Sequence, residues 1–235
     1  MMPLSFLPRT KLAILAISAL AFTSPCTSQA QDDLEALSLK VSKAEEANLT
    51  KLKGYLWKRQ SDTYVSEVLK ATVLMACEFD STGKLVVTPI DATTTVQQQR
   101  GIRGRMQQSA MEDNMDYVGK ALELSAHYIY MSKGQLLDVF SRSKLTTLEN
   151  GTLVITGSDV YVKGDQLIVH VDPKTHLFIY KGFTTKLGED AISGSAEYQS
   201  FTSSGVSHVD KTTLLLPAKK ARIVAVNKDY SQRVN

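Results

Sequence analysis

Residues 68–90, VLKATVLMACEFDSTGKLVVTPI, decide the fold of this chain. From Leu69 to Phe79 every second residue is apolar, whereas the residues between them are mixed in character. This period of two is typical of a β-strand, and the turn residues at 80–84 separate it from a second strand that begins at Leu85. One wholly apolar face beside a mixed face indicates an antiparallel sheet that is covered on one side only.

The segments on either side of this hairpin complete an α+β pattern. Apolar residues at helical spacing predict a helix over residues 33–53, and alternation predicts a strand over 55–65. After a polar connector at 91–104, a long helix is predicted from Arg105 and a short one over 132–141. The rest of the chain consists of about six strands separated by turn residues. This segregated order predicts helices packed on one face of a large antiparallel sheet.

The long helix carries one apolar stripe. Its members recur three or four residues apart, which places them on one face of the helix. We expect this face to pack against the sheet. The stripe consists of Met111, Met115, Val118, Leu122, Ser125 and Ile129.

The first 30 residues have the organisation of a secretory signal peptide. Arg9 and Lys11 form a basic start, residues 12–22 are apolar apart from one serine, and Ser28-Gln29-Ala30 is a small-x-small cleavage site. The apolar run is shorter than the roughly 18–20 residues that span a bilayer. We therefore expect cleavage after Ala30, an exported and periplasmic location, and a single domain over residues 31–235 without a transmembrane segment.

Charge and cysteine content narrow the function classes. The formal net charge is +3, and Arg9 and Lys11 supply two of these positive charges. The exported domain is therefore almost neutral, which argues against a nucleic-acid partner. Of the two cysteines, Cys26 lies in the leader and lacks the Leu-x-small-Cys context of a lipidation site. Cys77 is then the only thiol of the exported domain, so no internal disulfide is expected.

Five phrases, taken in order, resemble a known group of proteins. They are YLWKRQSDTYV (55–65), EFDSTGKLVVTPI (78–90), RGIRGRM (100–106), VDPKTHLF (171–178) and LLPAKKARIVAVNKDYSQ (215–232). Together they resemble uncharacterised exported bacterial proteins with the LolA/LolB-like fold of the periplasmic lipoprotein carriers. The resemblance implies a strongly curved antiparallel sheet, an incomplete β-barrel, whose concave face is plugged by helices. Lipid transport is implied only as a fold-level analogy.

Aromatic and methionine side chains are the candidate ligand contacts. Methionine adapts to irregular apolar surfaces, and such residues could line a cavity between the sheet and the helices. The alternative is that the helices fill the concave face and that these residues form an ordinary core. The candidates are Trp57, Met75, Phe79, Met111, Met115, Tyr128, Phe140, Phe178 and Tyr180.

A basic loop is the second candidate contact. Arg100, Arg103 and Arg105 accompany two glycines at the expected start of the long helix. Backbone N–H groups at a helix start favour anions, so this loop could hold a phosphate or a lipid headgroup. The alternative is that the three arginines only keep an exposed connector soluble.

One hairpin carries residues of metal-binding type. His170, Asp172 and His176 flank the same turn, but the sequence offers no fourth ligand nearby. Asp172 followed by Pro173 is typical of the start of a type I turn. We therefore interpret the three as solvated hairpin residues and expect neither a metal nor a cofactor.

The nucleophilic residues do not form a catalytic motif either. Cys77 shares its strand face with Met75 and Phe79, and without a cationic neighbour it is expected to be a buried, inert thiol. Ser207-His208 lies within a strand and lacks the sequence context of a nucleophile elbow. No catalytic residue is predicted.

These features favour a non-enzymatic exported protein of the cell envelope that binds a lipid or another apolar ligand between the sheet and the helices. A second interpretation is a protein-protein interaction or assembly module of the envelope with a closed core. A hydrolase built from scattered residues is the least favoured of the three.

Overall fold

The computed structural model describes residues 26–94 and 102–233, without the side chains of residues 26–32 and 102–113. The described residues form three α-helices and ten β-strands in an α+β order. The elements are α1 (Cys26–Leu52), β1 (Tyr55–Val65), β2 (Val68–Phe79), β3 (Leu85–Thr94), α2 (Ile102–Ile129), α3 (Lys133–Ser141), β4 (Lys144–Thr147), β5 (Leu153–Ser158), β6 (Gln166–Val171), β7 (Phe178–Leu187), β8 (Asp190–Ser200), β9 (Ser207–Leu216), a 3-10 turn (Pro217–Lys219) and β10 (Ala221–Gln232).

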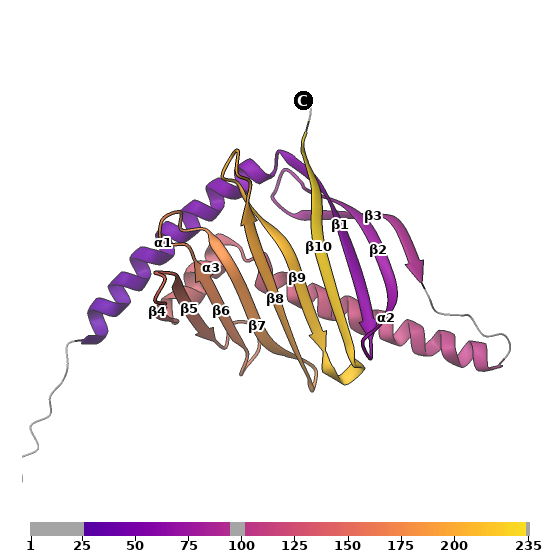
Figure 1. Cartoon of the computed structure of the whole chain (residues 1–235). Helices are drawn as coiled ribbons and strands as arrows, with labels where there is room; N and C mark the ends of the chain where they lie inside the picture. Colours follow the sequence, from indigo (N-terminus) through magenta and orange to yellow (C-terminus); the bar gives the residue numbers. More distant parts are fainter. Residues whose placement is uncertain (1–25, 95–101, 234–235) are drawn as a thin grey trace, which may run out of the picture.

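All ten strands belong to one antiparallel sheet, in the order β3-β2-β1-β10-β9-β8-β7-β6-β5-β4 (Figure 1). Strands β4 to β10 form a meander, and β1 to β3 attach to its last strand because β1 pairs with β10. The sheet is open, with β3 and β4 at its two edges. The segment α2–α3 connects these edges and therefore crosses one face. A helix of 28 residues is about 42 Å long, close to the roughly 43 Å that nine strand spacings span.

The main core lies between the three helices and one face of the sheet. Leu37 of α1, Tyr128 of α2 and Phe140 of α3 are all buried in it against residues of the strands, so the helices cover the same face. A smaller cluster surrounds Trp57 beside the C-terminal end of α1. The predicted α+β class is confirmed, with one open antiparallel sheet and helices packed on one of its faces.

The buried face of α2 is rotated from the predicted stripe. Ser125 and Ile129 are buried as expected, but Met115 and Leu122 are 70% and 45% exposed, so this part of the prediction is wrong. Both faces repeat at helical spacing, and periodicity alone does not distinguish them. The deciding contact is made by Tyr128, whose ring stacks on Phe183 of the sheet at 4.4 Å between centroids. The side chains that pack against the main core instead are Tyr117, Ala121, Leu124 and Tyr128, together with Val118.

Element boundaries differ from the prediction at several places. Helix α1 begins at Cys26 instead of residue 33, ahead of the expected cleavage site after Ala30, and α2 begins at Ile102 instead of Arg105. Seven strands follow the helices instead of six, because the short strand β4 pairs with β5 at the edge of the sheet. Strand β3 extends to Thr94, so residues 91–94 of the predicted connector belong to the sheet. Within the described residues, no helix has both the length and the apolar character needed to cross a membrane.

A β-bulge in β7 determines which side chains of this strand face the helices. Between Tyr180 and Phe178 the partner strand β6 advances by only one residue, so Ile179 is an extra residue in β7. Such an insertion shifts the alternation of a strand by one position. Phe178 and Lys181 consequently both lie on the helix side, whereas Tyr180 lies on the opposite face.

Candidate ligand-binding cavity

A cavity of about 400 Å³ lies between α1 and the sheet, at the C-terminal end of α2. Its volume falls within the range of about 300–1,000 Å³ that is typical of ligand sites. The walls come from α1, from the α2–α3 junction, from strands β7 to β9 and from the end of β2. Apolar side chains such as Leu49, Leu52, Phe79, Met131, Leu136 and Val209 share the wall with polar and charged ones, among them Glu45, Glu46, Asn48, Lys133, Lys181 and His208.

Helix α1 changes character where it passes over this cavity. It buries Leu37 and Val41 before the cavity and Leu52 at the far end of the cavity wall. Glu45 and Asn48 occupy the inward positions between them, at the spacing of three or four residues that keeps side chains on one helix face. This part of α1 therefore presents polar side chains to the cavity.

Glu45 and Asn48 bind backbone groups at the starts of two strands. The Glu45 Oε1 atom accepts a hydrogen bond from the backbone N–H of Phe178 at 2.9 Å. The Asn48 side chain donates to the carbonyl of Ser207 at 2.8 Å and accepts from its N–H at 2.7 Å. These bonds satisfy backbone groups that have no strand partner there. Hydrogen bonds thus hold this part of α1 over the cavity.

Lys181 supplies a buried positive charge to the cavity wall. Its side chain is 2% exposed, and Nζ donates to the carbonyl of Ile129, the last residue of α2, at 2.8 Å. The C-terminal carbonyls of a helix lack intrahelical partners and carry partial negative charge, so they stabilise a cation. Nζ also lies 3.8 Å from the centre of the Phe178 ring. Within the described residues, no carboxylate comes within 4.0 Å of it.

Glu45 and Lys181 influence one another across the cavity. Burial raises the pKa of Glu45 to about 6, against the opposing effects of Lys181 and of the Phe178 N–H. Burial lowers the pKa of Lys181 to about 8, against the opposing effect of Glu45. Burial also lowers the pKa of His208, which lines the same cavity. Near pH 7 the site therefore holds a carboxylate and an ammonium group that are close but not in contact.

A second polar group lies beside the cavity, in the cluster around Trp57. Arg59 of β1 donates from Nε to the Asn227 side chain at 2.9 Å and from Nη2 to the Tyr130 hydroxyl at 2.8 Å. Cys77 is buried nearby, and burial raises the pKa of its thiol although Arg59 opposes this. The predicted buried thiol is confirmed, and its cationic neighbour comes from the adjacent strand.

The predicted cavity residues do not all line the same cavity in the structure. Phe79 and Phe178 line the cavity, and Trp57 and Met75 belong to the cluster beside it. Phe140 and Tyr128 are part of the main core, and Met115 is exposed. The side chains of Met111, Arg103 and Arg105, and all of Arg100, lie outside the described residues.

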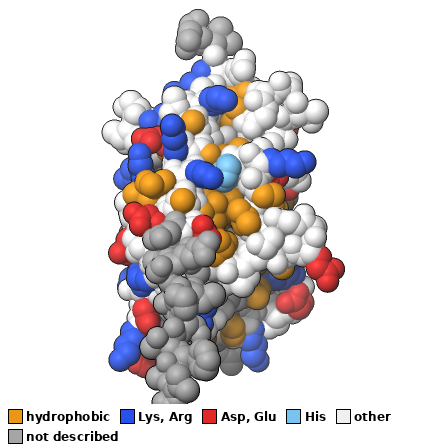
Figure 2. Space-filling view, turned by 90° about the vertical axis from the view of Figure 1, so that its left-hand side faces the viewer, with side chains coloured by type: hydrophobic (Ala, Val, Ile, Leu, Met, Phe, Trp, Pro, Cys, Tyr) orange, Lys and Arg blue, Asp and Glu red, His pale blue; other side chains and the backbone are white. Residues whose placement is uncertain are grey.

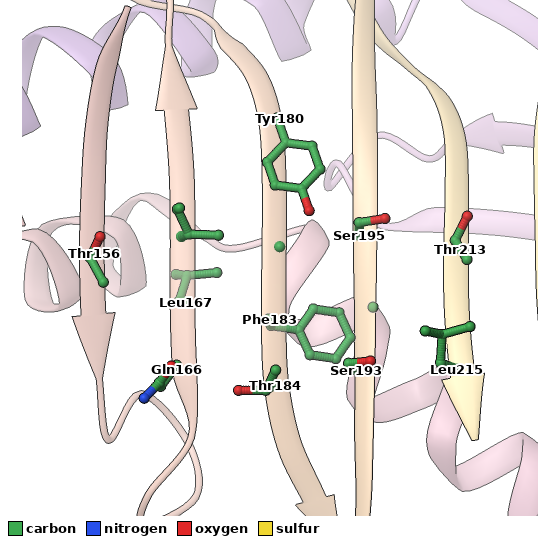
Figure 3. Close-up of a pocket in the computed structure, with 13 residues that line it drawn as sticks. Thr156, Gln166, Leu167, Tyr180, Phe183, Thr184, Ser193, Ser195, Thr213 and Leu215 are labelled. Atoms are coloured by element: carbon green, nitrogen blue, oxygen red, sulfur yellow. The ribbon is translucent and has the colours of Figure 1, made fainter. Parts of the chain in front are cut away.

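Tyr180 lines a groove on the helix-free face of the sheet (Figure 3). The groove is also about 400 Å³ and crosses strands β5 to β9. Gly182 leaves room for the Tyr180 side chain, because a Cβ atom at position 182 would lie 2.7 Å from the Tyr180 hydroxyl. Serine and threonine side chains line much of the rest, as Figure 3 shows for Ser193, Ser195 and Thr213.

The His170–His176 hairpin has the structure of a turn. The Asp172 carboxylate accepts hydrogen bonds from the N–H groups of Lys174 and Thr175, as predicted for the first residue of the turn. The His170 ring packs near that of Tyr180. In the part of the chain that the structure describes, no three histidine, cysteine or acidic residues are grouped to hold a metal ion.

Surface charge is mixed at the end of the molecule that carries β4. Figure 2 shows basic and acidic side chains scattered around hydrophobic ones on this face. This distribution agrees with the small net charge and offers no large region of a single sign on the face shown.

Two solved structures are similar to this chain over most of its length. The chain matches the structure of a DUF1329 family protein from Desulfovibrio piger with 8% identity and a TM-score of 0.43, over 88% of this chain and 94% of that one. It also matches a LolA superfamily protein from Nitrosomonas europaea with 9% identity and a TM-score of 0.37, over 84% and 94%. No protein-family model and no curated protein matches the chain.

The prediction from sequence missed Glu45, Asn48 and Lys181. A signal for the first two was present, because both interrupt the apolar face of a helix at inward positions. No such signal exists for Lys181, since strict alternation would place it on the face opposite Phe178. Only the bulge at Ile179 brings the two to the same side.

Proposed function

We propose that this chain is an exported, non-enzymatic protein of the cell envelope that holds an apolar or amphiphilic ligand in the cavity beneath α1. The observation that carries the proposal is the cavity itself, which has a volume of about 400 Å³ and is lined by both apolar and polar side chains, as an amphiphilic ligand requires. Glu45 and Asn48 support it as well, because they bring polar side chains of α1 to the wall of the cavity.

The first test is native mass spectrometry of the protein purified from its own host. We expect a small apolar molecule to remain bound. After removal of this molecule, the protein should bind an environment-sensitive apolar dye, and a ligand at about 100 times its Kd should add about 2.7 kcal/mol to the free energy of unfolding. A protein that binds no dye and gains no thermal stability from any lipid or detergent would contradict the proposal.

A pair of substitutions in α1 tests whether the ligand binds in the cavity. Ser42 lines the cavity and is 1% exposed, so Ser42→Leu should fill part of the space and weaken dye binding about tenfold. Ala47 lies on the exposed side of the same helix, so Ala47→Leu should leave binding unchanged. Equal binding by both variants would place the ligand elsewhere.

Export is part of the proposal. The signal peptide falls mostly outside the described residues, and cleavage after Ala30 would release a single domain over residues 31–235 into the periplasm. Sequencing of the mature protein from its N-terminus should begin at Gln31. A cytoplasmic protein that still carries Met1 would contradict this part.

An interaction module is the second candidate. Strand β3 is an edge of the sheet, and Val87 and Ile90 on it are 38% and 53% exposed. Edge strands with exposed apolar side chains are sites where another chain can add a strand. Recovery of a stoichiometric envelope protein without any co-purifying lipid would favour this function. Turnover in a screen for esterase, phosphatase and glycosidase activity would instead favour an enzyme.

A further inference from the structure

Lys181 is a buried cation with fewer hydrogen-bond acceptors around it than its ammonium group has donors. An ammonium group has three hydrogen-bond donors, and the described residues offer Nζ one acceptor, the carbonyl of Ile129. The Phe178 ring covers another side of Nζ. Buried charges are normally paired, because removal from water is costly unless an opposite charge or several hydrogen bonds replace it. The Lys181 ammonium group therefore has N–H donors available for a further acceptor in the cavity.

The charge count limits what that acceptor can be. Glu45 faces the same cavity, and its Oε1 atom is already engaged by the Phe178 N–H. Lys133 and Glu46 also line the cavity, but they form an ion pair with one another at 2.9 Å. A dianion such as a phosphate monoester would therefore add two negative charges beside Lys181 and the competing carboxylate of Glu45. A monoanion matches Lys181 alone. Carboxylates form short, charge-assisted hydrogen bonds with ammonium groups, which makes them suitable partners.

The apolar part of the wall determines the rest of the ligand. Leu49, Leu136 and Val209 are apolar, and Met131 can adapt to an irregular chain. A ligand that satisfies both parts of the wall has one carboxylate at one end and a single hydrocarbon chain at the other.

We propose that the cavity binds a single-chain carboxylate amphiphile, a fatty acid, with its carboxylate accepting a hydrogen bond from Lys181 Nζ. This inference rests on the proposed function and adds the class of the ligand. The protein's own Glu45 faces the same ammonium group across the cavity and competes with the ligand's carboxylate electrostatically. Loss of its charge should therefore favour the bound acid.

The test compares octanoate with 1-octanol, which has the same chain length and no charge. Isothermal titration calorimetry at pH 7 on the delipidated protein should give octanoate an affinity about tenfold higher than that of the alcohol. Lys181→Met should remove this preference while the alcohol still binds. The variant should fold, because a buried charge is replaced by an apolar side chain of similar length, and the Tyr198 hydroxyl still donates to the Ile129 carbonyl at 3.3 Å.

Two further variants control the experiment. Lys186 lies on the same strand and is exposed, so Lys186→Met should keep the preference for octanoate. Glu45→Gln should tighten octanoate binding about threefold and leave 1-octanol unchanged. Equal affinities of the wild-type protein for acid and alcohol, or a preference that persists in Lys181→Met, would overturn the inference and leave the proposed function standing. Failure of both probes to bind, with a water molecule bridging Glu45 and Lys181, would overturn both.

Discussion

Asp165 is the residue on which the loop between β5 and β6 is built. Its carboxylate accepts hydrogen bonds from the N–H groups of Val160, Tyr161 and Val162 at 2.6–3.0 Å, and from the hydroxyl of Tyr128. Burial alone would raise the pKa of Asp165, but these hydrogen bonds outweigh burial and lower it. The carboxylate therefore stays charged at neutral pH although it is 1% exposed.

Removal of the Tyr128 hydroxyl should destabilise the protein. Tyr128→Phe leaves a buried carboxylate without its side-chain donor, and we expect the free energy of unfolding to fall by about 1.5–3 kcal/mol in urea titrations at pH 7. Tyr161→Phe is the matched control, because that hydroxyl donates to the exposed carbonyl of His127, and it should cost about 0.5–1 kcal/mol. Equal losses in the two variants would show that Asp165 does not depend on Tyr128.

Gly194 allows a close contact between neighbouring strands. A Cβ atom at this position would lie 2.5 Å from Cζ of Phe183, whose ring crosses over it. Gly194→Ala should therefore lower the free energy of unfolding by about 1–3 kcal/mol through overpacking. Gly119→Ala, in the middle of α2 with no atom within 4 Å of the added methyl group, should instead stabilise by about 0.5–1 kcal/mol. Thermal unfolding of both variants tests these predictions. A Gly194→Ala protein with the same stability as the wild type would contradict the close contact.

Among the elements, α1 and β7 each contribute an ionisable side chain to the cavity, Glu45 and Lys181, and the charge of each depends on pH. The pKa of Glu45 in the folded protein is about 6, above its usual 4.5, so the folded state binds this proton more tightly than the unfolded state. The corresponding stability is complete below pH 4.5 and is lost as the pH rises to about 6. Lys181, Tyr198 and His208 face the same cavity and are present in wild type and variant alike.

Glu45→Gln should remove this pH dependence. Relative to the variant, the wild-type free energy of unfolding should fall by up to about 2 kcal/mol between pH 4.5 and pH 6.5, as measured by urea unfolding at both values. The difference between the two proteins is the informative quantity, because titrating groups that do not interact with Glu45 contribute equally to both. A difference that is constant with pH would show that the Glu45 carboxyl is solvated in the folded state.

At the scale of the whole molecule, the sheet has a strong centre and two weak edges. Strands β1, β9 and β10 have partners on both sides, whereas β3 and β4 have one partner each. Backbone amides open locally with a free energy that depends on such pairing and on burial. In native-state hydrogen exchange, amides of β10 should be protected near the global limit, and those of β3 and β4 should exchange first. Equal protection in β3 and β10 would mean that the edge is covered in solution.

Local sequence patterns predict the order of helices and strands apart from the short strand β4, the one-sided burial of β2 at Cys77 and Phe79, and the resulting α+β class. These features are local, because they depend on period-two or helical spacing and on turn residues within a few positions of one another. The turn at Asp172 and the buried Cys77 belong to the same group.

Which polar groups meet at the cavity depends on packing between distant parts of the chain. Lys181 reaches it because an extra residue at Ile179 shifts the alternation of β7, and local spacing carries no mark of such an insertion. Glu45 and Ile129 reach it because α1 and the end of α2 lie on the same face of the sheet, a placement set by the connection from one sheet edge to the other. Contacts between residues so far apart in the chain follow from packing, which a pattern of neighbouring residues does not record.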